Sequence, residues 1–196
     1  MEIILASGSP RRRELLERMG LRGFRVVVPH TQELLDPALT PAQQVERLSR
    51  EKAEAVCAQA APGSLIIAAD TVVALDGHIL GKPADEAQAR EMLTALSGRS
   101  HQVYTGFTVQ RDGEQVVEHE VTQVRFRALS GEDVAHYIAA GECLDKAGAY
   151  GIQGCGALLV EAIQGDYYNV MGLPIAHLAQ VLGRFGVDCL ALCAHV

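Results

Sequence analysis

The chain lacks the features that mark membrane, secreted and multidomain proteins. Its longest apolar stretch, Leu65 to Leu75, is interrupted by Asp70 and is too short to cross a membrane. The N-terminus has no apolar segment of the kind that directs secretion. No proline- or serine-rich linker and no internal repeat divides the 196 residues. These absences predict a soluble protein with a single domain over residues 1–196 and no membrane partner.

Positive charge is also scarce. The 17 lysine and arginine residues are outnumbered by 24 aspartate and glutamate residues, which gives a formal net charge of −7. Polymeric nucleic acids and anionic membranes favour broad basic surfaces, so we expect neither as a partner. Any site for an anion must therefore be local.

Paired cysteine motifs are absent as well. The five cysteines are odd in number and form no C-x-x-C motif, which favours reduced thiols and a cytoplasmic location. Cys189, Cys193 and His195 offer a metal site in the C-terminal tail as an alternative, but zinc sites normally have a fuller set of ligands. A loosely packed apolar terminus is the simpler interpretation of these residues.

Two common nucleotide-binding motifs are missing. The chain has no G-x-x-x-x-G-K-[ST] sequence, and Gly151, Gly154 and Gly156 follow an order that differs from the dinucleotide-binding fingerprint. We interpret the stretch from Gly148 to Gly156 as a flexible loop with an accessible backbone.

What is present begins with an arginine-rich turn. Residues 3–6 predict a strand, and Ser9 and Pro10 suit the N-cap and the first position of a helix. The arginines at positions 11–13 then add positive charge to the positive end of the helix dipole. Backbone N–H groups, serine hydroxyls and guanidinium groups together favour the binding of several phosphate oxygens. A solvated basic patch is the alternative.

The remaining sequence alternates between strand and helix patterns. Strands are expected over residues 24–28, 65–69, 72–75, 102–110, 121–127 and 157–163. Helices are expected after Thr40, Asp85, Ser130 and Pro174, and tight turns at Asp76-Gly77 and Asp112-Gly113. The pattern predicts a two-lobed α/β fold with a mixed, twisted sheet flanked by helices.

Two charged residues fall where core residues are expected. Lys52 lies within the apolar stripe of its predicted helix, and Asp70 interrupts an apolar strand, where an unpaired carboxylate is costly. Structural explanations are a lysine that extends past the helix end or a buried salt bridge, with Glu33 and Lys82 simply exposed. The functional alternative is a divalent ion, held by Asp70 and Glu33, that bridges to phosphates bound by arginine and lysine while water attacks phosphorus.

Several motifs occur in order along most of the chain. They are Ser7-Gly8-Ser9-Pro10-Arg11-Arg12, Ala69-Asp70-Thr71-Val72-Val73, Gly81-Lys82-Pro83, Ser97-Gly98-Arg99, His101 to Gly106, Glu142, Asp145 to Gly154, Gly165-Asp166-Tyr167 and Asn169 to Pro174. Together they resemble the Maf family, also called septum formation inhibitor proteins, with only the tail after Gly186 outside the match. The resemblance implies a fold similar to that of inosine triphosphate pyrophosphatase. It also implies hydrolysis of a nucleoside triphosphate to its monophosphate and pyrophosphate with Mg²⁺ or Mn²⁺.

The resemblance also implies roles for individual residues. Asp70 would be the catalytic acidic residue, either as proton acceptor or as metal ligand, and Glu33 would assist with metal or water. The residues implied in phosphate binding are Ser7, Ser9, Arg12, Lys52 and Lys82. The family often has two acidic residues where this chain has Gln32-Glu33. Arg13 is an additional arginine that we expect to be structural or auxiliary.

Substrate choice is implied by Arg11, Thr71 and Gln153, which match the branch of the family that hydrolyses dTTP and UTP. The sister branch, which acts on methylated GTP, usually has glutamate in place of the glutamine. A glutamine amide can accept from the N3–H of uracil or thymine and donate to a carbonyl, whereas a carboxylate only accepts.

The implied task is removal of canonical or modified pyrimidine nucleotides from the nucleotide pool, or control of cell division. The alternative is a nucleotide sensor that regulates septum formation without catalysis. The family also suggests a homodimer.

Replacing Gln153 by glutamate tests the base assignment. The change removes an amide donor and sets a negative charge against a base carbonyl, so we expect kcat/KM for UTP and dTTP to fall by about one to two decades, at about 1–3 kcal/mol per lost hydrogen bond. A methylated GTP should lose less activity, or gain it. The measurement is kcat/KM for all three nucleotides under the same metal conditions. A uniform loss would mean that Gln153 supports its loop instead of reading the base.

Overall fold

The computed structural model describes residues 1–194, so His195 of the alternative tail metal site lies outside the described part. The strands are β1 (Ile3–Ala6), β2 (Arg25–Val26), β3 (Leu65–Leu75), β4 (His78–Leu80), β5 (Ser100–Arg111), β6 (Glu114–Phe126) and β7 (Val160–Gln164). The α-helices are α1 (Pro10–Arg18), α2 (Pro41–Cys57), α3 (Glu86–Leu96), α4 (Gly131–Ala139), α5 (Tyr167–Met171), α6 (Ile175–Arg184) and α7 (Cys189–Cys193). Two short 3₁₀ helices, η1 (Ala147–Ala149) and η2 (Gly154–Leu158), precede β7.

The strands form one mixed sheet in the order β2-β1-β3-β5-β6-β7, and β4 pairs with β3 off this path. Strand β1 runs parallel to β2 and β3, whereas β4 is antiparallel to β3 and β7 is antiparallel to β6. The predicted α/β class with a mixed sheet and flanking helices is confirmed. Within residues 1–194, none of the helices is long and apolar enough to cross a membrane. The five cysteines all belong to the described residues and are free thiols.

The chain divides into two compact units. Unit 1 contains Met1–Asp70, Thr105–Glu120 and the chain from Gly172 onward, and unit 2 contains Thr71–Tyr104 and Val121–Met171. Strands β3, β5 and β6 therefore contribute residues to both units.

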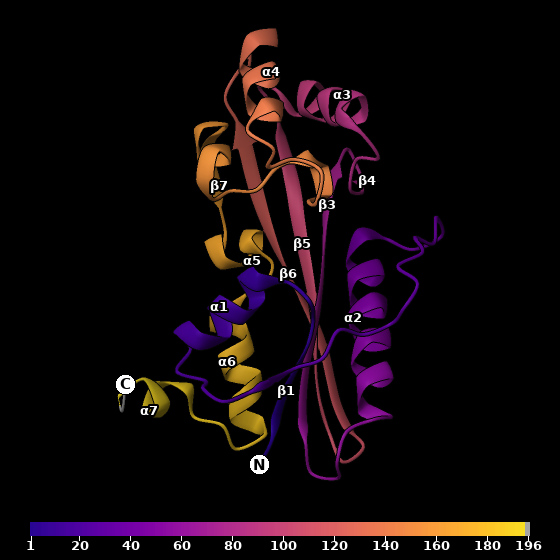
Figure 1. Ribbon diagram of the computed structural model, residues 1–196, viewed down its shortest axis with the longest axis vertical. Coiled ribbons are helices and arrows are strands. Elements are labelled where there is room, and N and C mark those ends of the chain that lie inside the picture. Colours follow the sequence, from indigo (N-terminus) through magenta and orange to yellow (C-terminus); the bar gives the residue numbers. More distant parts are fainter. Residues whose placement is uncertain (195–196) are drawn as a thin grey trace. The chain divides into compact units, whose positions relative to one another are not determined.

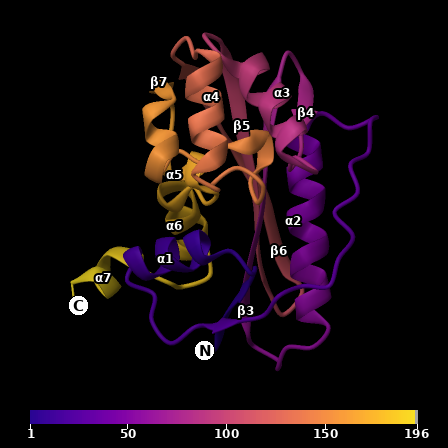
Figure 2. The ribbon, with the colours of Figure 1, turned by 45° about the horizontal axis from the view of Figure 1, so that its top comes forward.

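In unit 1, α2 lies on one side of the strands, and α1 and α6 lie on the other (Figures 1 and 2). Helix α2 begins with the predicted capping box, because the Thr40 hydroxyl accepts from the Gln43 backbone N–H while the Gln43 side chain accepts from that of Thr40. Its apolar side packs on β1 and β3 in a cluster that includes Ala53, Val56 and Ile66. Lys52 lies on the same buried side, as its position in the stripe predicted.

Helix α2 comes very close to the sheet at Gly106 of β5. A Cβ atom at Gly106 would lie 2.4 Å from both the carbonyl carbon and the carbonyl oxygen of Val45, so only glycine permits this distance. One turn further along, the hydroxyls of Ser49 and Thr108 are 2.9 Å apart. This close packing sets the depth at which the following turn of α2, with Lys52, enters the core.

Strand β5 exceeds its expected range by three residues, and β3 and β6 differ more from the expectation. Strand β3 runs unbroken through Asp70, because the carboxylate there is paired and does not end the strand. Strand β6 begins at Glu114 instead of residue 121. Several of its first residues are charged, so the sequence pattern did not predict a strand there. In the structure, the side chains of Glu118 and Glu120 contact the imidazole of His177 in α6, at 2.5 and 3.1 Å. By contrast, the strand expected over residues 24–28 is reduced to β2.

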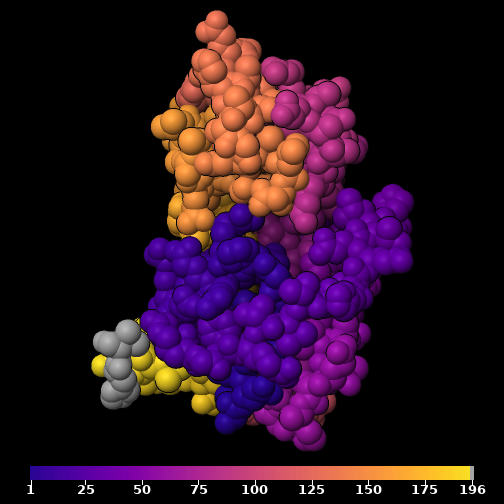
Figure 3. Space-filling view, in the orientation of Figure 1, coloured from indigo at the N-terminus to yellow at the C-terminus, as the bar shows by residue number. Residues whose placement is uncertain are grey.

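Residues 188–193 form a capped helix where the sequence predicted a loosely packed terminus. Asp188 caps α7 by accepting from the backbone N–H of Ala191, and Cys189 is buried. The helix packs against Gly20, where a Cβ atom would lie 2.8 Å from the backbone nitrogen of Cys193. The yellow C-terminal residues accordingly border the indigo N-terminal part on the surface (Figure 3).

In unit 2, α3 and α4 lie side by side (Figure 1) and share one apolar core. Both begin with the predicted side-chain caps, Asp85 for α3 and Ser130 with Asp133 for α4. The core contains a cluster of three rings, His101, Phe126 and Tyr150, packed edge to face with centroids 4.7–5.3 Å apart.

His101 is a fully buried histidine that remains neutral. Its Nε2 lies 2.7 Å from the Tyr150 hydroxyl, and among the described residues no partner faces its Nδ1. Burial lowers the pKa of His101 to about 4, since the imidazolium would lose its hydration.

The buried ring makes stability depend on pH. An unfolded histidine titrates near 6.5 and His101 near 4, so between these values the unfolded chain binds more protons and the folded state loses stability as pH falls. We expect this loss to reach about 2–3 kcal/mol at pH 4.5. Urea unfolding of wild type and His101→Gln at pH 7.5 and 4.5 measures it. The glutamine variant, which does not titrate, should show a smaller loss, and an equal loss in both proteins would contradict the assignment.

Candidate active site

The arginine-rich turn joins the end of β1 to the start of α1. Ser7 is buried directly after β1, and its hydroxyl oxygen accepts from the Ser9 backbone N–H at 3.2 Å and from Arg12 at 3.3 Å. Ser9 occupies the predicted N-cap position, with Pro10 first in the helix. The turn therefore brings two serines and Arg12 together, as the sequence predicted for a phosphate-binding segment.

Arg12 is held in place by a distant segment. Its Nε donates to the backbone carbonyl of Gly172 at 2.8 Å, between α5 and α6. Burial lowers the pKa of Arg12, the nearby charge of Arg11 acts in the same direction, and the carboxylates of Asp70 and Glu33 oppose both. A half-buried guanidinium of this kind is stabilised by an incoming anion, because the anion supplies hydrogen bonds and charge where water has been partly removed.

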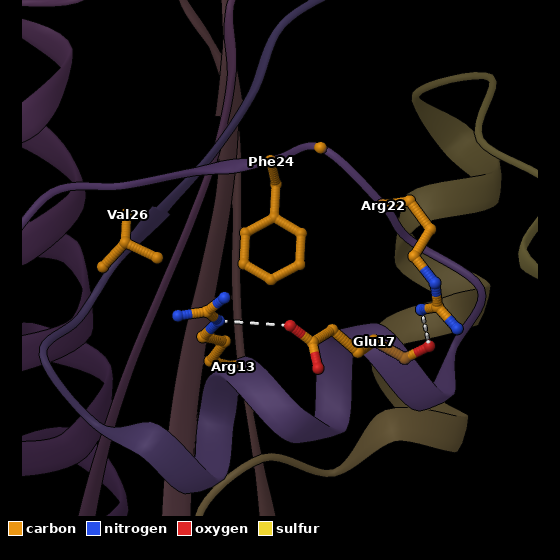
Figure 4. Close-up of a pocket in the computed structure, with 6 residues that line it drawn as sticks. Arg13, Glu17, Arg22, Phe24 and Val26 are labelled. Atoms are coloured by element: carbon orange, nitrogen blue, oxygen red, sulfur yellow. Dashed lines mark hydrogen bonds and ion pairs between the residues drawn. The ribbon is translucent and has the colours of Figure 1, made fainter.

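Arg13 turns to a different part of unit 1. It is exposed and pairs with Glu17 of the same helix, Nε to Oε1, at 3.1 Å. In Figure 4 these two side chains lie beside Arg22, Phe24 and Val26 around a pocket of about 270 Å³. The pocket is lined by none of the residues implied in phosphate binding. This location agrees with the auxiliary role expected for Arg13.

The two charged residues expected in the core, Lys52 and Asp70, form a salt bridge with each other. The Lys52 ammonium lies 2.6 Å from Asp70 Oδ1 and 2.6 Å from Glu33 Oε1. The Lys52 and Asp70 side chains are only 7% and 9% exposed, whereas that of Glu33 is 48% exposed. The structure thus contains the buried salt bridge that the sequence left open as an alternative. It also places a carboxylate pair beside Lys52, as the functional interpretation requires.

The carboxylate pair has the right chemistry for a hard divalent cation. Carboxylate oxygens suit Mg²⁺ and Mn²⁺, and Mg²⁺ is commonly bound by one or two carboxylates together with substrate phosphates and water. Among residues 1–194, no group of three or more histidine, cysteine, aspartate or glutamate side chains is arranged to hold a metal by itself. Asp70 and Glu33 therefore fit a metal that takes its other ligands from a bound phosphate chain.

Unit 2 contains the other three residues singled out by the sequence, Thr71, Lys82 and Gln153. Lys82 is exposed after β4, and its neighbour Gly81 accepts a backbone hydrogen bond from Gly148 at 3.0 Å. This bond connects the segment of Lys82 to the glycine-rich stretch with Gln153. Thr71 and Gln153 are both half-buried.

The glycine-rich stretch is not the flexible loop that was expected. It forms η1 and η2, and its glycines meet specific neighbours. A Cβ atom at Gly156 would lie 1.8 Å from the carbonyl oxygen of Gly151, so the two backbone segments touch. Gly148 and Gly154 have φ values of 67° and 62°, which side chains rarely adopt. The glycines of this stretch allow close packing of the backbone and do not make it flexible.

Gly172 is a contact of the arginine-rich turn that sequence reasoning missed. Its contribution is a backbone carbonyl, which no residue type reveals. The available indication was a glycine before Leu173-Pro174, consistent with its φ of 111°.

Known proteins match nearly the whole chain. The family model described as "Maf-like protein" matches residues 2–185. The chain is 52% identical over 185 residues to a dTTP/UTP pyrophosphatase of Symbiobacterium thermophilum, covering 94% of each protein. It is 47% identical over 187 residues to a dTTP/UTP pyrophosphatase of Bacillus cereus, covering 95% of this chain and 91% of that protein. The fold resembles that of a HAM1 protein from Coxiella burnetii, with a TM-score of 0.51, 18% identity and coverage of 94% and 99%.

Removing the buried lysine should destabilise the protein far more than removing its exposed partner. Lys52→Met leaves Asp70 as an uncompensated buried charge, so we expect the free energy of unfolding to fall by about 3–5 kcal/mol. Glu33→Gln should cost less than about 1 kcal/mol, because that pair is half-exposed. Urea unfolding at pH 7.5 measures both. The double variant Lys52→Met/Asp70→Asn should regain much of the loss, and equal losses in the two single variants would contradict the assignment.

Proposed function

The chain belongs to the Maf family, and on that premise we propose that it hydrolyses dTTP and UTP to the nucleoside monophosphate and pyrophosphate. The observation that carries the proposal is the buried pair of Lys52 and Asp70 in the same unit as the Arg12 turn. Relatives named for this activity match the chain nearly end to end.

In the proposed reaction, the triphosphate is bound by cationic and hydroxyl groups. Arg12 presents a forked guanidinium to phosphate oxygens, and Ser7 and Ser9 add hydroxyl groups at the start of α1. Lys52 exchanges part of its contact with the two carboxylates for a phosphate oxygen. Lys82, which the family resemblance implies in phosphate binding, is proposed to add a further positive charge. These groups offset the charge of the phosphate chain and of the leaving pyrophosphate.

Asp70 is the group proposed to act on water. A water oxygen forms a bond to the α-phosphorus, its proton passes to the Asp70 carboxylate, and the anhydride bond to the β-phosphate breaks with release of pyrophosphate. The carboxylate is suited to this role because it is buried and held in one position by Lys52.

A divalent cation, Mg²⁺ or Mn²⁺, completes the proposal. Asp70 would hold it, with Glu33 as a second ligand or as a partner of its water, and it would supply Lewis-acid polarisation of the phosphate oxygens. The two carboxylates fit such an ion because both already face a single positive charge, the Lys52 ammonium.

Base recognition is proposed for Arg11, Thr71 and Gln153. Gln153 offers an acceptor and a donor in one amide, which matches the N3–H and the neighbouring carbonyl of uracil and thymine. We further propose a cytoplasmic, single-domain enzyme, active as a homodimer, that removes canonical or modified pyrimidine nucleotides from the nucleotide pool.

Replacing Asp70 by asparagine tests the proposed chemistry. The amide has nearly the same shape but cannot accept the proton of water or bind a cation well, so we expect kcat for UTP to fall by roughly 10²–10⁴-fold. Purified protein is assayed for UMP and pyrophosphate with Mg²⁺, and circular dichroism checks that the variant is folded. Near-normal turnover would exclude Asp70 from catalysis. A folded wild type that binds UTP but releases no pyrophosphate would instead support the nucleotide sensor.

A further inference from the structure

Gln153 lies between two glycines that are each covered by a charged side chain. A Cβ atom at Gly154 would lie 2.8 and 2.9 Å from the two carboxylate oxygens of Glu142. A Cβ atom at Gly151 would lie 2.8 Å from the Cδ and Cε atoms of Lys146. Glu142 and Lys146 thus pack directly against the backbone on both sides of Gln153.

Hydrogen bonds join these groups into one assembly within unit 2. The backbone N–H of Cys155 points at Glu142 Oε1, 3.4 Å away, at the start of η2. The Lys146 ammonium donates to the backbone carbonyl of Glu142 at 2.7 Å. On the other side, Tyr137 of α4 accepts from the Gly151 backbone N–H at 3.2 Å. The glycines are therefore required by their neighbours, because any side chain at Gly151 or Gly154 would displace Lys146 or Glu142.

We propose that Glu142 is a positioning residue for Gln153 and thereby sets the affinity for the pyrimidine base. The Glu142 carboxylate packs on Gly154, whose φ is 62°, and accepts a hydrogen bond from the backbone N–H of Cys155. These contacts fix the direction in which the backbone leaves Gln153. The amide is then held in place before the base arrives, so binding does not have to order the segment. This inference rests on the proposed function, in which Gln153 reads the base.

The proposed role of Glu142 depends on an oxygen that reaches the Cys155 N–H, and not on the negative charge of the carboxylate. Variants of Glu142 can test the length and the charge of the side chain separately. Glu142→Gln keeps an oxygen that can accept from Cys155 and should stay within about twofold of wild type. Glu142→Ala removes the contact, and we expect kcat/KM for UTP to fall about tenfold, mainly through KM. Glu142→Asp, which withdraws the carboxylate by one methylene group, should fall in the same direction and serves if the alanine variant does not fold. Glu132→Ala, an exposed change on α4, is the matched control.

A double variant distinguishes positioning from a general structural role. If Glu142 acts through Gln153, adding Glu142→Ala to Gln153→Ala should cause no further loss beyond about twofold. The proposal would be overturned if the fold-losses in kcat/KM of Glu142→Ala and Gln153→Ala multiplied in the double variant, or if the loss in Glu142→Ala were confined to kcat. Unchanged kcat/KM in both folded Glu142→Ala and Glu142→Asp would overturn it as well.

Calorimetric titration with UMP tests the inference independently of turnover. Glu142→Ala and Gln153→Ala should each weaken UMP binding about tenfold, and the double variant should be no weaker than Gln153→Ala. If wild type binds UMP in this pattern but releases no pyrophosphate from UTP, the proposed function fails while the positioning role of Glu142 stands. A wild type that hydrolyses UTP, with UMP binding insensitive to Glu142→Ala, gives the reverse result. Failure of wild type to bind either nucleotide would overturn both proposals.

Discussion

The buried ion pair of Lys52 and Asp70 is the constraint around which unit 1 is arranged. Removing two charges from water is costly, and their attraction compensates only when geometry is tight, as at 2.6 Å. That tightness depends on how deeply α2 enters the core, which Gly106 permits by letting Val45 touch the sheet. A pair of apolar residues would be a simpler way to fill the same space. The charges are therefore better explained by binding and chemistry than by stability.

At several places in this molecule a glycine allows a neighbouring segment to approach the backbone closely. At Gly106, Gly151 and Gly156 the absent side chain makes room for a neighbouring backbone or stem. These contacts lie close to residues with a proposed function, Lys52 in one unit and Gln153 in the other. The Arg12 turn follows a related principle, since a backbone carbonyl helps to fix its guanidinium.

Local rules were sufficient for much of the fold and for the burial of Lys52 and Asp70. Capping boxes at Thr40 and Ser130, turns at Asp76 and Asp112, and the apolar stripe with Lys52 all depend on residues close in sequence. The errors arose where distant partners decide the structure. Strand β3 passes through Asp70, whose carboxylate is paired with Lys52, and the charged side chain of Glu118 near the start of β6 is paired with His177 of α6. The order of the glycine-rich stretch likewise depends on side chains outside it, such as that of Tyr137.

The hydrogen bond from Arg12 to Gly172 also has a consequence for synthesis of the chain. Its two partners are 160 residues apart, so Arg12 leaves the ribosome long before its carbonyl acceptor exists. At about 5–20 residues per second, that interval is about 8–32 s. During this time β1 has no β3 beside it until residues 65–68 emerge, whereas the Ser7 hydroxyl of its own turn is available to Arg12 from the start. The first motif to be translated is therefore among the last to reach its final form, and a nascent chain cut short before Gly172 cannot complete it.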